Sequence, residues 1–360
     1  WNPDYFQKLN LILLYSIYFI MKKSLVIVES PAKCNKIQNY LGSGYIVKAS
    51  FGHICNLDTK KGLDAVDVKN HYKPKFINIK EKKKYIDDLK KHASNCDEVI
   101  IASDLDREGE AIGYHVCRVL KLDLKKTKRI VFNEITKKAI QQAVKDFRYL
   151  DMNLVNAQQA RQILDFVIGF DVSPVLWKYI KSGISAGRCQ TPALRLVNEK
   201  EESIDGFQST NFFDLQGKFT IEFEDEGEES GLHEDCSLAI DFDCKHSKKL
   251  KNKDIAIKAL EKYKTSEFEI TDISMSESKS KSGAPFITST LQQECSNKLS
   301  VPPAKTMSIA QKLYEGGLIT YMRTDSKIIS EDCLDTLKEY VTESYGADYY
   351  KLTHYKNDSN

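Results

Sequence analysis

The chain has 360 residues, which is long enough for two or more domains with separate cores. Its composition, 41% hydrophobic and 29% charged, is typical of a globular protein, and its net charge of +2 does not by itself indicate a polyanionic partner. The nine cysteines include no C-x-x-C pair, which argues against a disulfide or zinc framework and favours the reduced thiols of an intracellular protein.

Residues 1–20 are predicted to be an extension outside the folded domains, since Met21 resembles a true start. The apolar run 9–20 is short for a membrane span, and no A-x-A-like cleavage site follows it. The extension is read-through from upstream, a targeting or anchor segment, or a packed helix.

The first apolar run, Leu25–Val28, predicts a buried strand that ends in Glu29. Ser30 and Pro31 then predict the start of a helix that stops at Gly42. Such a helix N-terminus attracts phosphate, and Lys33 adds a cation in its first turn. The structural alternative is a capping acid and a solvated lysine.

A second buried strand is predicted at Val99–Ala102 and is followed by Asp104, Asp106 and Glu108. Acids at alternate positions of an extended turn point one way, and the end of a strand is where an open α/β sheet places its ligand site. Oxygen ligands without nearby His or Cys favour Mg²⁺. A solvated acidic turn is the alternative, but Glu29 at the end of a parallel strand favours a metal site.

Further strands and helices should alternate through the first domain, which predicts a mainly parallel α/β sheet closing near Tyr149. They are a strand at 46–51, a charged helix at 80–96, a third strand at 129–134 and a helix from Thr136. The lone His53 after the strand is more often structural than catalytic in such a position.

A helix is predicted over residues 151–170, with Gln and Arg side chains on neighbouring turns that suit a polar ligand or an exposed face. The small residues at 185–192 predict a turn that presents Arg188 and Gln190 before a helix at 193–202, and the glycine in it permits close approach of a nucleic-acid strand.

Period-two alternation from Phe213 to Phe223 predicts a strand with one buried face and the start of a β-rich domain. The acidic segment 224–235 is predicted to be a loop and 274–283 a connector. A strand should resume at 238–242, and helices should form at 289–299 and 306–314.

Tyr321 stands in the segment that follows these helices, two residues before Arg323. A tyrosine hydroxyl, with a pKa of about 10, is a poor nucleophile at neutral pH unless a cation or a base activates it. In an extended segment Arg323 lies on the same side and can hold a phosphate against the tyrosine. A packing tyrosine is the alternative, because the chain has 18 tyrosines.

Seven motifs occur in the order found in type IA DNA topoisomerases, and the chain resembles the bacterial topoisomerase I group most. The motifs are L-V-I-V-E-S-P-A-K at 25–33, D-L-D-R-E-G-E-A-I at 104–112, F-N-E-I-T at 132–136, N-A-Q-Q-A-R at 156–161, S-A-G-R-C-Q-T-P-A-L at 185–194, P-F-I-T-S-T-L-Q at 285–292 and I-T-Y-M-R-T-D-S at 319–326. The resemblance is weak at 56–72 and 224–260.

The resemblance implies a Rossmann-like α/β TOPRIM domain, followed by helical and β-rich domains of a toroidal, multidomain protein. The implied domains are the TOPRIM domain at 21–150, the first part of a helical DNA-groove domain at 151–210, the first part of a β-rich arch at 211–280 and a truncated catalytic tyrosine domain at 281–360. The family's H-E-A-I-R-P segment and C-terminal domains are not in this sequence, so we expect a fragment.

The resemblance also implies the site residues. Tyr321 would attack a DNA phosphodiester and become joined to a 5′ phosphate that Arg323 stabilises, while Glu29 or Lys33 would manage the proton on the leaving 3′ oxygen. Mg²⁺ would bind to the set Glu29, Asp104, Asp106 and Glu108, chiefly through Asp104 and Asp106. DNA contacts are expected at His53, Arg107, Arg129, Arg161, Asp165, Ser185, Arg188, Gln190, Thr320 and Asp325.

The implied function is the ATP-independent relaxation of negatively supercoiled DNA through transient single-strand cleavage. Alternatives are a topoisomerase III-like decatenase, a TOPRIM nuclease and a single-strand DNA-binding protein. We expect single-stranded DNA segments as partner, a monomer, no membrane, and a cytoplasmic, nucleoid-associated location in a bacterium or organellar targeting in a eukaryote. The positions that read a cytosine in bacterial members are Gln162, Phe166 and Phe170 here, and a basic residue near His53 is replaced by Cys55, so the cleavage preference stays open.

Overall fold

The computed structural model describes residues 23–223, 238–278 and 282–356. The predicted extension at 1–20 and the acidic loop at 224–235 lie outside these residues. The chain forms two compact units, one containing the described parts of 1–191 and 282–360 and the other Pro192–Lys281. Within the described residues, no helix is both long enough and apolar enough to cross a membrane. The domain boundaries near 150, 210 and 280 stay predictions.

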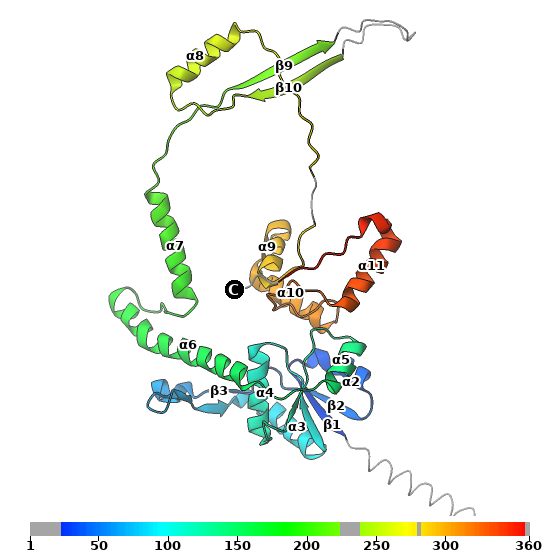
Figure 1. Cartoon of the computed structure of the whole chain (residues 1–360). Coiled ribbons are helices and arrows are strands. Elements are labelled where there is room, and N and C mark those ends of the chain that lie inside the picture. Colours follow the sequence, from blue (N-terminus) through cyan, green and yellow to red (C-terminus); the bar gives the residue numbers. More distant parts are fainter. Residues whose placement is uncertain (1–22, 224–237, 279–281, 357–360) are drawn as a thin grey trace, which may run out of the picture. The chain divides into compact units, whose positions relative to one another are not determined.

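A four-stranded parallel sheet organises the first unit, in the order β2-β1-β7-β8. Figure 1 labels β1 and β2, its first two strands along the chain. Its strands are β2 (Tyr45–Ala49), β1 (Ser24–Val28), β7 (Glu98–Ile101) and β8 (Lys128–Arg129). The expected α/β sheet is therefore confirmed, and β1 and β7 lie side by side with Leu25 opposite Val99. The carboxyl ends of these two strands, where the acids follow, meet at one edge.

Helices cover both faces of this sheet because successive residues of β1 point to opposite sides. Val26 and Val28 pack in one buried cluster with α2 (Cys34–Leu41) and α5 (Lys137–Lys145). Leu25 and Ile27 pack in a second cluster with α3 (Lys83–Ser94) and α4 (Arg107–Leu120). Two small antiparallel pairs, β3 (Cys55–Leu57) with β6 (Phe76–Asn78) and β4 (Val66–Asp67) with β5 (Lys73–Pro74), complete this region.

The third strand is shorter than predicted, since β8 ends at Arg129 rather than at residue 134. Ile130 still donates a hydrogen bond of 2.9 Å to Ile101 of β7, but farther on the backbone carbonyl of Asn133 accepts a hydrogen bond of 2.7 Å from the Tyr321 amide. This contact joins the sheet to the segment after α10 (Pro303–Glu315). Tyr321, Met322 and Tyr314 consequently belong to the same buried cluster as Val28.

The remaining helices of the first unit are α6 (Met152–Tyr179), α9 (Thr288–Leu299) and α11 (Glu331–Tyr345). α6 runs nine residues beyond the predicted end at 170 and contains Pro174. An interior proline costs one backbone hydrogen bond, and the helix continues past it. Short 3-10 turns occur at Pro31–Lys33, Thr59–Ala65, Lys80–Lys82 and Ala347–Tyr349.

The second unit contains most of α7 (Gln190–Asp205), an antiparallel pair and α8 (Lys253–Lys264). β9 (Gln216–Phe223) pairs with β10 (Leu238–Lys245), with Phe219 opposite Phe242. Gly217, Phe219 and Ile221 are half-buried while the residues between them are exposed, so the predicted period-two alternation is confirmed.

Gly109 is a position where the first turn of α4 allows no side chain. A Cβ built there would lie 2.1 Å from the carbonyl oxygen of Asp104, which is backbone and cannot move aside. The Ser103 hydroxyl also donates a hydrogen bond of 2.6 Å to the Gly109 carbonyl. The acidic turn 103–109 is therefore closed tightly upon the start of the helix.

We predict that Gly109→Ala destabilises the protein by about 3 kcal/mol or more, because backbone must shift to admit the methyl group. Gly44→Ala is the matched control, because nothing lies within 4 Å of a Cβ at Gly44 and its φ is not positive. The free energy of unfolding in urea measures both variants. Equal values for the two variants would contradict the close packing of the turn.

Candidate active site

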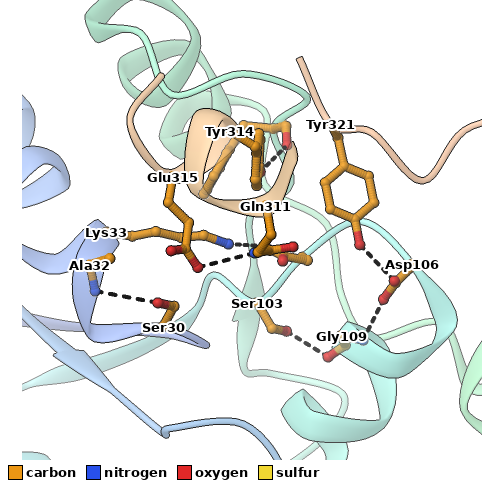
Figure 2. A network of polar contacts seen from close by, with 12 residues as sticks. Ser30, Ala32, Lys33, Ser103, Asp106, Gly109, Gln311, Tyr314, Glu315 and Tyr321 are labelled. Atoms are coloured by element: carbon orange, nitrogen blue, oxygen red, sulfur yellow. Dashed lines mark hydrogen bonds and ion pairs between the residues drawn. The ribbon is translucent and has the colours of Figure 1, made fainter. Parts of the chain in front are cut away.

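A cavity of about 370 Å³ lies at the carboxyl ends of β1 and β7, within the first unit. Side chains from the sheet and from the α10 region converge on it (Figure 2). They include Glu29, Asp104, Gln311, Glu315, Tyr321 and Arg323. The cavity therefore brings together predicted metal ligands and the predicted nucleophile from segments about two hundred residues apart in sequence.

Lys33 and Asp104 form a buried ion pair at the floor of this site. The side chains are 0% and 5% exposed, and the Lys33 ammonium donates to Oδ1 of Asp104. Lys33 is placed by a 3-10 turn that Ser30 caps, as its hydroxyl accepts a hydrogen bond of 3.3 Å from the Ala32 amide. A buried charge needs such a partner, because burial without one costs several kcal/mol.

Asp106 uses both carboxylate oxygens. Oδ1 caps α4 by accepting a hydrogen bond of 2.8 Å from the Gly109 amide. Oδ2 accepts a hydrogen bond of 2.6 Å from the Tyr321 hydroxyl and one of 3.2 Å from Arg323 (Figure 2 shows the tyrosine contact). Burial, followed by the hydrogen bond to the Asp106 carboxylate, raises the pKa of Tyr321 far above its ordinary value. The tyrosine is therefore neutral here, with its proton directed at a carboxylate.

Glu29 is the most perturbed carboxyl of the cavity. Burial and the nearby charge of Asp104 raise its pKa to about 7; Asp106 adds a smaller contribution in the same direction, and Lys33 opposes part of the shift. Glu29 is thus close enough to Asp104 and Asp106 to be repelled by both. Such crowding of oxygen ligands is the chemistry that a divalent cation relieves.

The carboxylates of these three acids are of the kind that binds Mg²⁺. In the structure, however, several of their oxygens are engaged by other side chains. Asp104 is paired with Lys33, and Asp106 is bonded to Tyr321 and Arg323. In the part of the chain that the structure describes, no group of three His, Cys, Asp or Glu side chains is arranged to hold a metal ion. Metal binding through these acids remains a proposal.

The prediction that Glu108 shares a face with Asp104 and Asp106 is wrong. Glu108 accepts a hydrogen bond of 3.1 Å from Gln158 and lies 3.0 Å from Nε2 of His53. The reason is that α4 begins at Arg107, so residues two apart follow the helical turn of about 100° per residue instead of strand alternation. The hydrogen bond with His53 is the main cause that lowers the pKa of Glu108.

Glu108 instead lines a second cavity of about 330 Å³, between the sheet domain and α6. Several predicted DNA contacts come together there, namely His53, Arg161 and Asp165. Arg188 forms a two-pronged ion pair with Asp165, at 2.9 and 3.2 Å. Gln162 donates a hydrogen bond of 2.9 Å to Asn56 on the wall of this cavity.

Arg129 cannot contact DNA in this structure, so its prediction as a DNA contact is wrong. Its side chain is 0% exposed and donates to the backbone carbonyls of Ser103 and Asp104, each at 2.7 Å. It also pairs at 3.4 Å with the fully buried Glu110, to which Arg148 donates as well. Burial, more than any opposing charge, lowers the pKa of Arg129 to about 10. Arg129 supports the acidic turn from beneath.

The other predicted DNA contacts lie at the surface. Arg107, Ser185, Thr320 and Asp325 are exposed. Gln190 is also exposed and donates hydrogen bonds of 2.6 and 3.0 Å to the carbonyl and hydroxyl oxygens of Ser185. Their contacts with DNA stay predictions.

Three residues of α10 belong to the site and were missed by the sequence analysis. Gln311 and Glu315 line the first cavity and share a hydrogen bond of 3.0 Å, and Tyr314 is fully buried between the site's side chains (Figure 2). The available signal was the i, i+4 spacing of Gln311 and Glu315 on a helix that leads directly to Tyr321.

Comparison with known families assigns both parts of the chain. Residues 24–135 match the Toprim domain, and residues 149–360 match the DNA topoisomerase family. The chain therefore belongs to the type IA DNA topoisomerases and is related to bacterial topoisomerase I. Toprim domains generally bind Mg²⁺, and members of this family act on DNA.

A solved structure of similar fold is full-length topoisomerase I from Thermotoga maritima in a monoclinic crystal form. It is 38% identical over 91% of this chain, with a TM-score of 0.69. The match covers 54% of the Thermotoga protein, so the chain spans about half of its length.

We predict that Arg129→Met lowers the free energy of unfolding by about 3–5 kcal/mol, because it leaves the buried Glu110 charge with one partner fewer. Arg188→Met, which removes an exposed pair, should cost less than about 1 kcal/mol. Arg129→Met combined with Glu110→Leu should recover part of the loss. Urea unfolding of the three variants checks this. If Arg129→Met instead had normal stability and bound DNA more weakly, Arg129 would be a direct DNA contact after all.

We further predict that the metal-free sheet domain becomes less stable as the pH rises from about 4.5 to about 7. The pKa of Glu29 is raised from 4.5 to about 7 in the folded state. Between these two values the folded state keeps a proton that the unfolded state has released, so the free energy of unfolding falls as the pH rises and levels off above about pH 7. Hydrogen exchange of the β1 and β7 amides, at about pH 5 and about pH 8, measures the change after correction for intrinsic rates. Glu29→Gln should remove this pH dependence, whereas Glu261→Gln, at an exposed glutamate, should leave it unchanged. A pH dependence that persists in Glu29→Gln would show that another group causes it.

Proposed function

We propose that the protein relaxes negatively supercoiled DNA by cutting one strand, passing another through the gap and rejoining the cut. The observation that supports this most directly is the Tyr321 hydroxyl at 2.6 Å from Asp106, beside Arg323 and the strand-end acids. Membership of the type IA family and the similarity to a topoisomerase I support the same reaction.

In the proposed cleavage step the Tyr321 oxygen attacks the phosphorus of a DNA backbone phosphate. A bond from the tyrosine oxygen to phosphorus forms while the bond from phosphorus to the 3′ oxygen breaks, which leaves a 5′ phosphotyrosine and a 3′ hydroxyl. Asp106 already accepts the hydrogen bond of the tyrosine and is positioned to take its proton. Glu29 or Lys33 supplies the proton that the leaving 3′ oxygen requires.

Arg323 is proposed to hold the phosphate during this step. Its guanidinium lies 3.2 Å from the oxygen of Asp106 that Tyr321 contacts, so both side chains face the same point. A guanidinium binds two phosphate oxygens at once and stabilises the charge that develops on them. One phosphodiester bond is exchanged for another, so religation by the 3′ hydroxyl needs no ATP.

Asp104 and Asp106 are the residues that would hold Mg²⁺, with Glu29 next to them. The bound ion supplies positive charge for the phosphate group and its orientation. Asp104, which is paired with Lys33 in the structure, would then share its carboxylate between the ion and that ammonium. The second cavity, with His53, Arg161 and Asp165, is proposed to receive the single strand next to the cut, because its flat polar side chains suit nucleotide bases.

We predict that Tyr321→Phe abolishes covalent capture of single-stranded DNA. The protein is incubated with 5′- or 3′-labelled single strands and Mg²⁺, denatured, and analysed by electrophoresis. Wild type should retain the DNA segment downstream of the cut on protein, through its 5′ end. Tyr340→Phe, which changes an exposed tyrosine, should behave like wild type.

Other outcomes select the other candidate functions. Free nicks that persist in Tyr321→Phe would indicate a TOPRIM nuclease, and DNA retention without cutting would indicate a binding protein. Preferential unlinking of catenated circles over relaxation of supercoils would favour a topoisomerase III-like decatenase.

A further inference from the structure

Tyr314 occupies the centre of the candidate site without reaching its surface. It lies near the end of α10, its side chain is 0% exposed, and it stands between Lys33 and Tyr321 (Figure 2). Lys33 is also 0% exposed. A fully buried tyrosine and a fully buried lysine in contact with each other need a physical reason, because both carry polar groups that prefer water.

The ring of Tyr314 contacts both predicted catalytic side chains. The Lys33 ammonium lies over the ring, 4.8 Å from its centroid, while it pairs with Asp104. The Tyr321 ring lies 5.1 Å away at 67°, an edge-to-face arrangement. The Tyr314 hydroxyl makes a long contact of 3.5 Å with the Phe132 carbonyl. The ring, rather than the hydroxyl, makes the close interactions.

The electrostatics of a ring suit this position. The face of an aromatic ring carries negative potential and attracts a cation, most strongly where water is excluded. Burial and the charges of Asp104 and Glu29 raise the pKa of Tyr314 far above its ordinary value, so the ring stays neutral. Asp104 attracts the ammonium, and the ring holds the same ammonium against lateral movement.

We propose that Tyr314 is a positioning residue of DNA cleavage: the face of its ring fixes the Lys33 ammonium beside Asp104, and its contact with Tyr321 sets the nucleophile at the same point. This inference rests on the proposed function and assigns a role to a residue that cannot touch DNA, since it is 0% exposed. Its loss therefore slows bond cleavage and leaves DNA affinity unchanged.

The test replaces Tyr314 by phenylalanine and then by phenylalanines with increasing ring fluorination, in the whole protein. Fluorine withdraws electron density from the ring face but barely changes its shape, so the buried side chain still fits. Two quantities are measured: the single-turnover rate of covalent adduct formation at saturating labelled single-stranded DNA, and the dissociation constant for the same DNA.

We expect Tyr314→Phe to form the adduct at close to the wild-type rate, because the hydroxyl contact is long. The rate should fall stepwise with fluorination, by about tenfold for the trifluorinated ring, which corresponds to loss of a desolvated cation–π interaction. DNA affinity should not change. Ile140→Val, in the same buried cluster and on α5, is the packing control and should leave the rate unchanged.

Three results would overturn the inference. A rate of adduct formation that does not depend on fluorination would show that Tyr314 only fills space in the core. A large loss of this rate in Tyr314→Phe would assign the positioning role to the hydroxyl. A parallel loss of DNA affinity would show that Tyr314 acts on binding. If wild type itself forms no adduct, the proposed function fails and the inference fails with it, a result distinct from the other three.

Discussion

The arrangement of the site depends on the Asp106 carboxylate, whose two oxygens make different hydrogen bonds. One oxygen caps α4 through the Gly109 amide, and the other accepts the Tyr321 hydroxyl and Arg323. The cap fixes the carboxylate because the turn around it is closed by Gly109, which leaves no room for a side chain. A rigid helix start thus fixes the position of a tyrosine that is 215 residues away in sequence.

Tyr321 is held by burial as well as by this hydrogen bond. Tyr321 and Met322 are 7% and 6% exposed and pack in the cluster that contains Val28 of the central strand. The backbone bond from the Tyr321 amide to Asn133 adds a polar contact across the same junction. Any step that separates the tyrosine segment from the sheet must expose these apolar side chains, at about 25 cal/mol per Å². Burial and this hydrogen bond therefore hold the tyrosine segment against the sheet in the structure.

Local sequence patterns were sufficient for the sheet and for most of its helices. The apolar runs of β1 and β7, the Ser30 cap and the helix start at Thr136 all depend on interactions within a few residues, and each is present as predicted. Long-range contacts were not predictable in this way. The strand at 129 stops early because Asn133 binds the tyrosine segment, and the burial of Arg129 depends on Glu110, which packs against it only in the folded chain. Motif order located Tyr321, but nothing local placed Tyr314 against Lys33.

The position of α4 explains why one acidic motif serves two cavities. Asp104 and Asp106 precede the helix and face the tyrosine, whereas Glu108 lies within its first turn and points to His53 and Gln158. A strand would have kept all three acids on one side, and the helix turns the last one away. The carboxylates around Tyr321 are thereby Asp104, Asp106 and Glu29 at the strand ends together with Glu315 from α10, and Lys33 offsets part of their charge. Under the proposed function, a further carboxylate there would repel the phosphate that approaches Tyr321. Directed at His53, it instead orders the wall of the neighbouring cavity, where Arg161 and Gln162 are placed.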